Sequence, residues 1–330
     1  MRVVALEEHF TVPDTTDYLR SQAIDAQQVL LSRMQERWSA QLEDVGESRL
    51  KEMDETGISV QVLSLAGIGA DALPAESSLD FARAANDMLA QRIAAHPDRF
   101  YGFAHVPADE PEAAADELER CITEFAFRGV MISGTTRGDF LDAPRFRPFL
   151  ERVEKLNVPL YVHPSLPPKP VMDAYYDGLP GGLGYMLAAG AWGWHSETAL
   201  HILRLVLSGT LDRFPKLRLI VGHMGEGLPF MLERIDDMFE LIADKDLQRS
   251  VSETILDQLH ITTSGFFSLP PFMAALHSFG ADRILFSVDY PFSSNKRGEK
   301  FLASLPVSPE DRQKIAHGNA DRILNLGGKP

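Results

Sequence analysis

Five side chains that can bind a metal or move a proton stand at the ends of short apolar runs. Glu7 and His9 lie in the run 3–10, His163 in 158–164, His223 in 217–225 and Asp289 in 284–291. Glu7 and His9 are two residues apart, so on a strand their side chains leave the same face. Carboxylates buried among imidazoles are costly unless a cation compensates them. The pattern therefore indicates a site for one divalent metal ion.

The ligand types restrict the metal only in part. Carboxylates and imidazoles without sulfur suit Zn²⁺, and also Mn²⁺, Fe²⁺ or Co²⁺. Cys121 is the only cysteine, so the chain can form neither a thiolate cluster nor an intrachain disulfide. It lies in an amphipathic helical stretch, where we expect a buried and inert thiol.

A second acidic residue follows His223 at a useful spacing. Glu226 comes three residues later in VGHMGEGLPF, close enough for its carboxylate to hold the imidazole. His223 would then act as a general acid or base rather than as a metal ligand. The alternative is that Glu226 merely favours the N-terminus of the next helix, as any acidic residue does there.

Three further residues are candidates for substrate contacts. His195, next to Trp194 in AGAWGWHSETALHILRL, stands where a helix begins, and Trp192 and Trp194 could wall a substrate pocket. Equally, these tryptophans could belong to the core or to a subunit contact. Arg234 in LERIDDM could bind a substrate carboxylate, or form an ion pair along its helix.

The elements that position these residues alternate regularly. Helical patterns, for example at 76–96, 109–126 and 308–326, separate eight strand signals: 3–10, 58–67, 100–107, 129–133, 158–164, 217–225, 259–265 and 284–291. This alternation predicts an α/β chain folded as a (β/α)₈ TIM barrel, with residues 1–330 as one domain. In such a barrel the C-terminal strand ends share one mouth, where the candidate residues would meet.

Two stretches are too long for a minimal barrel. Residues 11–50 follow the first strand and residues 165–194 follow the fifth. We expect both long loops at the rim of the mouth, where barrel enzymes carry substrate loops and oligomer contacts.

Charge and hydropathy restrict the partners. The net charge is −15, from 47 acidic and 32 basic residues, which argues against nucleic acid or an anionic membrane as partner. The most apolar stretch, 183–194, is shorter than a membrane span and is broken by glycines. The N-terminus lacks the apolar run of a secretory signal, so a cytoplasmic location is expected.

Several segments together resemble the amidohydrolase superfamily. They are EEHF at 7–10, YVHP at 161–164, GHMGEGLPF at 222–230 with the following RID, HITTSG at 260–265 and ADRILFSVDYPF at 281–292. The resemblance runs from residue 3 to about 325. It is closest to the metal-dependent decarboxylase branch, which includes γ-resorcylate and 2,3-dihydroxybenzoate decarboxylases, because the first strand carries Glu-x-His instead of the commoner His-x-His.

The resemblance implies roles for individual residues. It implies that His223 and Glu226 form a catalytic pair. It also implies four metal ligands: Glu7, His9, His163 and Asp289. Two segments depart from the branch: 165–168 (SLPP) replaces an Arg-Asn segment, and GWHSET replaces Phe-Ala-Gln-Glu-Thr. Both lie where substrate groups would be contacted.

We therefore predict non-oxidative decarboxylation of a hydroxylated aromatic carboxylic acid, with one Zn²⁺ or Mn²⁺ as template and Lewis acid. Asp289 would deliver a proton to the ring carbon, and His223, held by Glu226, would shuttle charge. The rival hypothesis is a metal-dependent hydrolase of a lactone, an amide or a related bond, with Asp289 as base. A third is a barrel that has lost catalysis and serves as a scaffold. The family further implies a homodimer or a homotetramer.

Overall fold

The computed structural model describes residues 1–13, 37–67, 69–242 and 247–327. Its eight strands all pair in parallel with their neighbours. In chain order they are β1 (Val4–Phe10), β2 (Val60–Leu65), β3 (Phe100–Gly102), β4 (Val130–Ser133), β5 (Leu160–His163), β6 (Leu219–Val221), β7 (Leu259–Thr262) and β8 (Ile284–Leu285). The ladders form two runs, β1–β2–β3 and β4 to β8.

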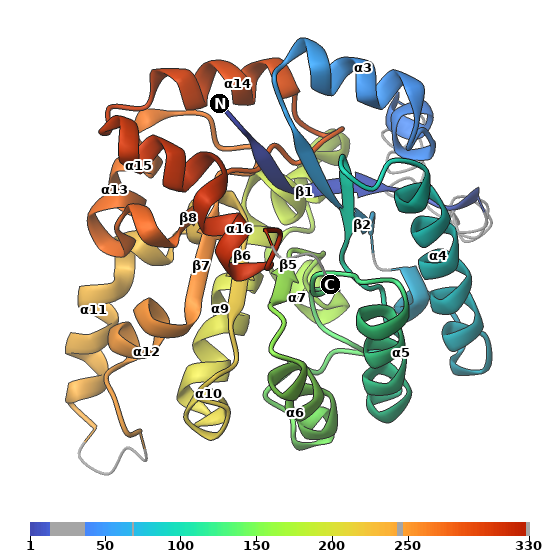
Figure 1. Cartoon of the computed structure of the whole chain (residues 1–330). Coiled ribbons are helices and arrows are strands. Elements are labelled where there is room, and N and C mark those ends of the chain that lie inside the picture. The colour runs from blue at the N-terminus through green and yellow to red at the C-terminus, as the bar shows by residue number, and fades with distance from the viewer. Residues whose placement is uncertain (14–36, 68, 243–246, 328–330) are drawn as a thin grey trace.

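Two single bridges join these runs. Ala104, just after β3, pairs in parallel with Val130 of β4, and Glu8 of β1 pairs in parallel with Tyr290 beyond β8. The ring is thereby closed, and helices surround it (Figure 1). The predicted α/β barrel is confirmed.

The helices in the described part of the chain range from short turns to long helices. They are α3 (Glu47–Glu55), α4 (Ala75–Ala95), α5 (Pro111–Glu124), α6 (Arg147–Leu156), α7 (Lys169–Tyr175), α8 (Leu183–Met186), α9 (Gly193–Leu207), α10 (Thr210–Arg213), α11 (Leu228–Glu240), α12 (Val251–Gln258), α13 (Leu269–Phe279), α14 (Asn295–Ser304), α15 (Pro309–Gln313) and α16 (Asn319–Ile323). None of the described helices is long and apolar enough to cross a membrane.

The period of two along each strand divides the core. Val4 and Leu6 of β1 pack inside the barrel with Tyr161 of β5, whereas Ala5 and Val162 pack outward against the helices. The register of β1 against β2 then shifts between Ala5 and Glu8, and beyond this irregularity Glu7 faces inward and Glu8 outward. The helix α16 joins the inner cluster, and an ion pair between Arg2 and Asp321 places it at the N-terminal end of β1. The opposite end of the barrel is left for the polar residues.

Several predicted strand boundaries were wrong. The run 284–291 forms ladder contacts only at Ile284 and Leu285, because the N–H groups of Val288 and Tyr290 donate to the Glu8 side chain instead of to a strand. Asp289 therefore stands four residues beyond β8. Similarly, β6 ends at Val221, and His223 lies in a short 3₁₀ turn, η5 (His223–Gly225).

The two long insertions differ in how far they can be described. In the predicted insertion 11–50, residues 14–36 lie outside the described part, while 37–43 are helical and α3 begins at Glu47. The insertion after β5 carries α7, η3 (Pro180–Gly182), α8 and η4 (Leu187–Ala191), and ends where α9 begins. The predicted helix 308–326 is divided into α15, η7 (Lys314–Gly318) and α16.

Candidate metal centre

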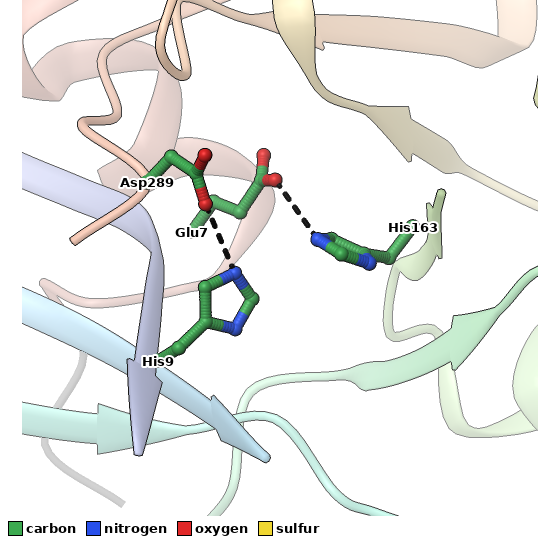
Figure 2. Close-up of side chains that lie close together, drawn as sticks. All are labelled: Glu7, His9, His163 and Asp289. Carbon is green, nitrogen blue, oxygen red and sulfur yellow. Dashed lines mark ion pairs between the residues drawn. The ribbon is translucent and has the colours of Figure 1, made fainter. Parts of the chain in front are cut away.

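Four of the predicted side chains meet at the mouth of the barrel. Glu7 and His9 come from β1, His163 from the end of β5 and Asp289 from the segment after β8; one possible ligand atom of each lies within 4.8 Å of the others. His9 Nε2 lies 3.3 Å from Asp289 Oδ1, and His163 Nε2 lies 3.3 Å from Glu7 Oε1. Figure 2 shows the four side chains directed toward one another: Glu7 and His9 from β1, His163 from β5 and Asp289 from the segment after β8.

Outer contacts fix how the two imidazoles are turned. His9 Nδ1 lies 3.1 Å from Ser64 Oγ, and His163 Nδ1 lies 2.8 Å from the carbonyl oxygen of Pro164, to which it can donate. The Nε2 atom of each ring is thereby directed to the centre, as in metal sites whose histidines are held through their second nitrogen.

Two buried atoms in this centre have no hydrogen-bond partner. They are Glu7 Oε1 and His9 Nε2, on side chains that are wholly buried. An unpaired buried polar atom costs about 1–3 kcal/mol, so native proteins rarely keep two together. Both face the same point, where a cation would satisfy them. The residues present therefore fit one divalent metal ion.

The other oxygen of Glu7 is occupied. Glu7 Oε2 accepts hydrogen bonds from the Tyr161 hydroxyl and from Ser264 Oγ, and Thr262 Oγ1 lies 3.5 Å away. A Cβ atom at position 222 would stand 2.6 Å from Glu7 Oε2, so only glycine fits between this carboxylate and β6. These contacts hold the carboxylate with Oε1 toward the centre.

Charges at the centre support the same arrangement. Burial raises the pKa of Glu7, but attraction to His223, His163 and His9 outweighs it and holds that pKa well below its usual range. Burial also raises the pKa of Tyr161 far above its usual value, so its hydroxyl keeps the proton that it donates to Glu7. The centre thus offers an ionised carboxylate to a cation.

Beside this group, one carboxylate holds two imidazoles. Glu226 Oε1 lies 2.7 Å from His223 Nδ1, and Glu226 Oε2 lies 2.5 Å from His195 Nδ1. The helix α11 begins only at Leu228, so Glu226 precedes it, and its side chain is engaged with the histidines instead of with the helix N-terminus. The predicted proximity of His223 and Glu226 is present; the contact with His195 was not predicted.

His223 also faces the four-residue group. Its Nε2 lies 3.5 Å from Glu7 Oε1 and 3.9 Å from Asp289 Oδ2. Burial lowers the pKa of His223, but the Glu226, Glu7 and Asp289 carboxylates together raise it to about 10. A cation held by Glu7 would oppose that rise. His223 therefore lies within reach of Glu226 on one side and of Glu7 and Asp289 on the other.

The remaining sequence candidates are divided. The His195 ring lies 4.9 Å from the His223 ring, between centroids, so His195 joins the site. Trp194 is half-buried and Trp192 is 62% exposed, and their role as walls of a substrate pocket stays a prediction. Arg234 is exposed on α11, and within the described residues it has no hydrogen bond or ion pair with another candidate. Its predicted role stays a prediction.

A cavity of about 500 Å³ lies on the far side of Phe292, and none of the four candidate ligands is part of its lining. Its lining includes Trp38, Phe292 and Arg297. The Phe292 ring lies 5.5 Å from the His9 ring and 5.2 Å from the Trp38 ring, between centroids.

Sequence reasoning missed the residues that support the ligands. Tyr161 stands two residues before His163, and the period of two that placed Glu7 inside the barrel could have placed its ring there too. Ser264 in HITTSG stands two residues after Thr262, the last residue of β7, so the same period of two could have placed its side chain inside the barrel. Ser64 carried no signal, because its contact with His9 depends on the register of β1 against β2, where the two residues are direct partners.

Comparisons with known proteins agree with this geometry. The family model described as Amidohydrolase matches residues 9–326. A γ-resorcylate decarboxylase from Rhizobium sp. (strain MTP-10005) is 39% identical over 335 aligned positions, which cover 98% of each chain. The crystal structure of 2,6-dihydroxybenzoate decarboxylase complexed with 2,6-dihydroxybenzoate has a TM-score of 0.89 and 37% identity, covering 99% of this chain and 100% of that one.

A third comparison includes a metal. The structure of a dihydroxybenzoic acid decarboxylase from Polaromonas sp. JS666, with bound manganese and the inhibitor 2-nitroresorcinol, has a TM-score of 0.89 and 35% identity. The alignment covers 99% of this chain and 98% of that chain.

Proposed function

Because this chain belongs to the amidohydrolase family, we propose that it is a metal-dependent carboxy-lyase acting on a hydroxylated aromatic carboxylic acid of the dihydroxybenzoate kind. The observation that carries the proposal is the group of Glu7, His9, His163 and Asp289, in which two buried atoms without partners face one point. Relatives that resemble this chain over nearly its whole length are decarboxylases of such acids.

The same four residues would hold the metal ion. Bound there, a divalent ion supplies a template and a Lewis acid for the acidic oxygens of the substrate. Manganese is the first candidate because a similar structure contains it, and zinc suits the same ligands. Glu7 contributes Oε1, since its Oε2 is taken by Tyr161 and Ser264.

Asp289 is the proposed proton donor. It delivers a proton to the ring carbon that bears the carboxylate. This carbon becomes tetrahedral, and the ring loses its aromaticity. The bond to the carboxylate then breaks, its electron pair returns to the ring, and CO₂ leaves. One proton is consumed and no oxidant is needed, so atoms and electrons balance.

The proton on Asp289 must be replaced in each cycle. His223 is the proposed source, because its Nε2 lies 3.9 Å from Asp289 Oδ2. Glu226 stabilises the charged imidazole through Nδ1, and His195 shares the second oxygen of that carboxylate. In this proposal His195, Trp194 and Arg234 contact the substrate.

Solvent labelling tests the reaction class. In D₂O the product should carry one deuterium at the carbon that lost the carboxylate, and mass spectrometry or proton NMR would detect it. A product that instead contains oxygen from H₂¹⁸O, with no CO₂ released, would establish hydrolysis and refute the lyase.

We also propose that the enzyme acts in the cytoplasm as a homodimer or homotetramer. Large apolar side chains lie exposed along α8, the start of α9 and α11: Leu183, Trp192, Phe230 and Leu241 are between 60% and 84% exposed. Apolar surface of this extent favours a protein contact. Light scattering should give two or four chains, and Phe230→Asp should lower that number; a monomeric wild-type protein would contradict the proposal.

A further inference from the structure

Glu8 lies next to a candidate ligand but faces the other way. On β1 its side chain leaves the face opposite to those of Glu7 and His9, and it is wholly buried. It is not part of the group that could hold a metal. Its function must therefore be sought on the outer side of the strand.

There the Glu8 carboxylate spans the segment that carries Asp289. Glu8 Oε1 accepts the N–H of Val288 at 2.9 Å and the hydroxyl of Ser287 at 3.2 Å, while Oε2 accepts the N–H of Tyr290 at 3.1 Å. The two backbone donors come from the residues directly before and after Asp289. One side chain thus holds both flanks of the proposed proton donor.

Asp289 needs such support, because its backbone has φ of 69°. This left-handed conformation is unfavourable for L-residues, although aspartate tolerates it better than most. The carbonyl groups of the segment are bound elsewhere: that of Val288 to the Gly265 N–H and that of Tyr290 to the His9 N–H. Without Glu8, the two N–H groups would be buried without an acceptor.

A buried cation accompanies this carboxylate. The Arg49 guanidinium lies 4.7 Å from the centre of the Tyr290 ring, and it donates to the carbonyl oxygen of His9 at 2.6 Å. Arg49 is itself 1% exposed and comes from α3. Arg49 thus packs against the segment after β8 and binds the outer side of β1.

We propose that Glu8 is a positioning residue. By holding the N–H groups on both sides of Asp289, it orients the Asp289 carboxylate toward the other three candidate metal ligands. The proposal rests on the proposed function, because it takes Asp289 as both ligand and proton donor. It predicts that the effect of Glu8 on the metal passes through Asp289.

The test compares Glu8→Gln with a matched control. A glutamine has one acceptor oxygen and places an N–H₂ group against the other backbone N–H. We expect affinity for Co²⁺ and kcat each to fall about 10- to 100-fold, as for other residues that support metal ligands, with KM changed less than threefold. The visible absorption of bound Co²⁺ should also shift, which reports ligand geometry apart from activity.

Glu117→Gln is the control. Glu117 is equally buried and accepts from Arg120, Arg83 and Asn86, but it lies on α5 and is not part of the group that could hold a metal. This variant should unfold at a lower temperature and keep the wild-type Co²⁺ affinity, Co²⁺ spectrum and kcat. A similar loss of metal affinity in both variants would mean that any buried charge has this effect, and would overturn the proposal.

A double variant decides whether the effect passes through Asp289. Glu8→Gln combined with Asp289→Asn should bind Co²⁺ no more than twofold more weakly than Asp289→Asn alone. If the fold losses in Co²⁺ affinity of the two single variants multiply in the double variant, the proposal is overturned. If Glu8→Gln does not fold, Glu8→Asp gives the same comparison, because it keeps the carboxyl group but is too short to reach both N–H groups.

The outcomes also separate this inference from the proposed function. A wild-type protein that binds no divalent metal, or an Asp289→Asn variant that binds it as tightly as the wild type, refutes the metal site itself. If the wild type binds the metal and Asp289→Asn binds it more weakly, but the Co²⁺ affinity of Glu8→Gln is unchanged, only the role of Glu8 is refuted.

Discussion

Replacing Tyr161 by phenylalanine tests how the Glu7 ligand is oriented. The Tyr161 hydroxyl donates to Glu7 Oε2 deep inside the barrel, and its ring packs among inner core residues that phenylalanine would also contact. The change therefore removes one hydrogen bond while the packing is kept. Ser264 Oγ remains as a donor to the same oxygen.

The magnitude follows from the type of bond. A hydrogen bond to a charged group contributes about 1.5–3 kcal/mol, which corresponds to about 10- to 150-fold in an equilibrium constant. Because Ser264 retains part of the orientation, we expect metal affinity to fall about 10- to 50-fold. Without Tyr161 the Glu7 carboxylate can rotate more freely, and metal binding must then fix its orientation.

The assay is competition of the metal-free protein with a fluorescent chelator for Mn²⁺ or Zn²⁺. Tyr101→Phe is the matched control, since Tyr101 on β3 lies against Arg128 and, in the described part of the chain, forms no hydrogen bond with the four candidate ligands. A Tyr161→Phe protein of normal thermal stability whose metal affinity stays within twofold of the wild type would refute the reasoning.

Two other predictions concern buried histidines. Glu226→Gln should lower kcat about 10²- to 10⁴-fold, because His223 and His195 lose the carboxylate that holds them. Metal affinity should stay within threefold of the wild type. Steady-state kinetics that show kcat near the wild-type value would contradict this prediction. His201 accepts the Leu141 N–H through Nε2, and burial lowers its pKa from 6.5 to about 4. Below pH 6.5 protonation of His201 therefore favours the unfolded chain. The contribution of neutral His201 to the free energy of unfolding is complete above that pH and is lost as the pH falls toward 4. The loss amounts to about 2 kcal/mol at pH 5. His201→Gln, which keeps an acceptor but does not titrate, should reduce the acid sensitivity of unfolding measured in denaturant between pH 7 and 5; an unchanged sensitivity would contradict it.

The barrel and its ligand-bearing strands could be predicted because their patterns are local. Alternating apolar runs and helices indicated the fold, and the spacing of Glu7 and His9 placed both side chains on one face. His163 ends β5 as expected. These inferences need only the period of a strand and the rule that parallel strand ends share one mouth.

The supporting contacts could not be predicted because they depend on register and on backbone turns. Ser64 meets His9 only in the observed pairing of β1 with β2. Asp289 was placed at a strand end, but the ladder stops at Leu285, since Glu8 takes the N–H groups on either side of Asp289. A single sequence does not show which buried carboxylate takes over such donors.

The insertion after β5 was the hardest segment to interpret. His195 reaches Glu226 because α9 begins at Gly193, directly after the π-helical turn η4 and Trp192. No periodicity in 165–194 indicates that turn. The exposure of Trp192 likewise depends on how the turn ends, so its side chain could not be assigned from the sequence alone.

The most direct test of the central claim is the rate of CO₂ release from a panel of ortho-hydroxybenzoates, followed by loss of ultraviolet absorbance. Wild-type protein and Asp289→Asn would be compared at Mn²⁺ or Zn²⁺ concentrations that saturate both, and asparagine tolerates the left-handed backbone of position 289. We predict turnover that requires the metal and falls at least about 100-fold in Asp289→Asn. No CO₂ from any acid with metal-loaded wild-type protein, or an Asp289→Asn rate within threefold of the wild type, would contradict it.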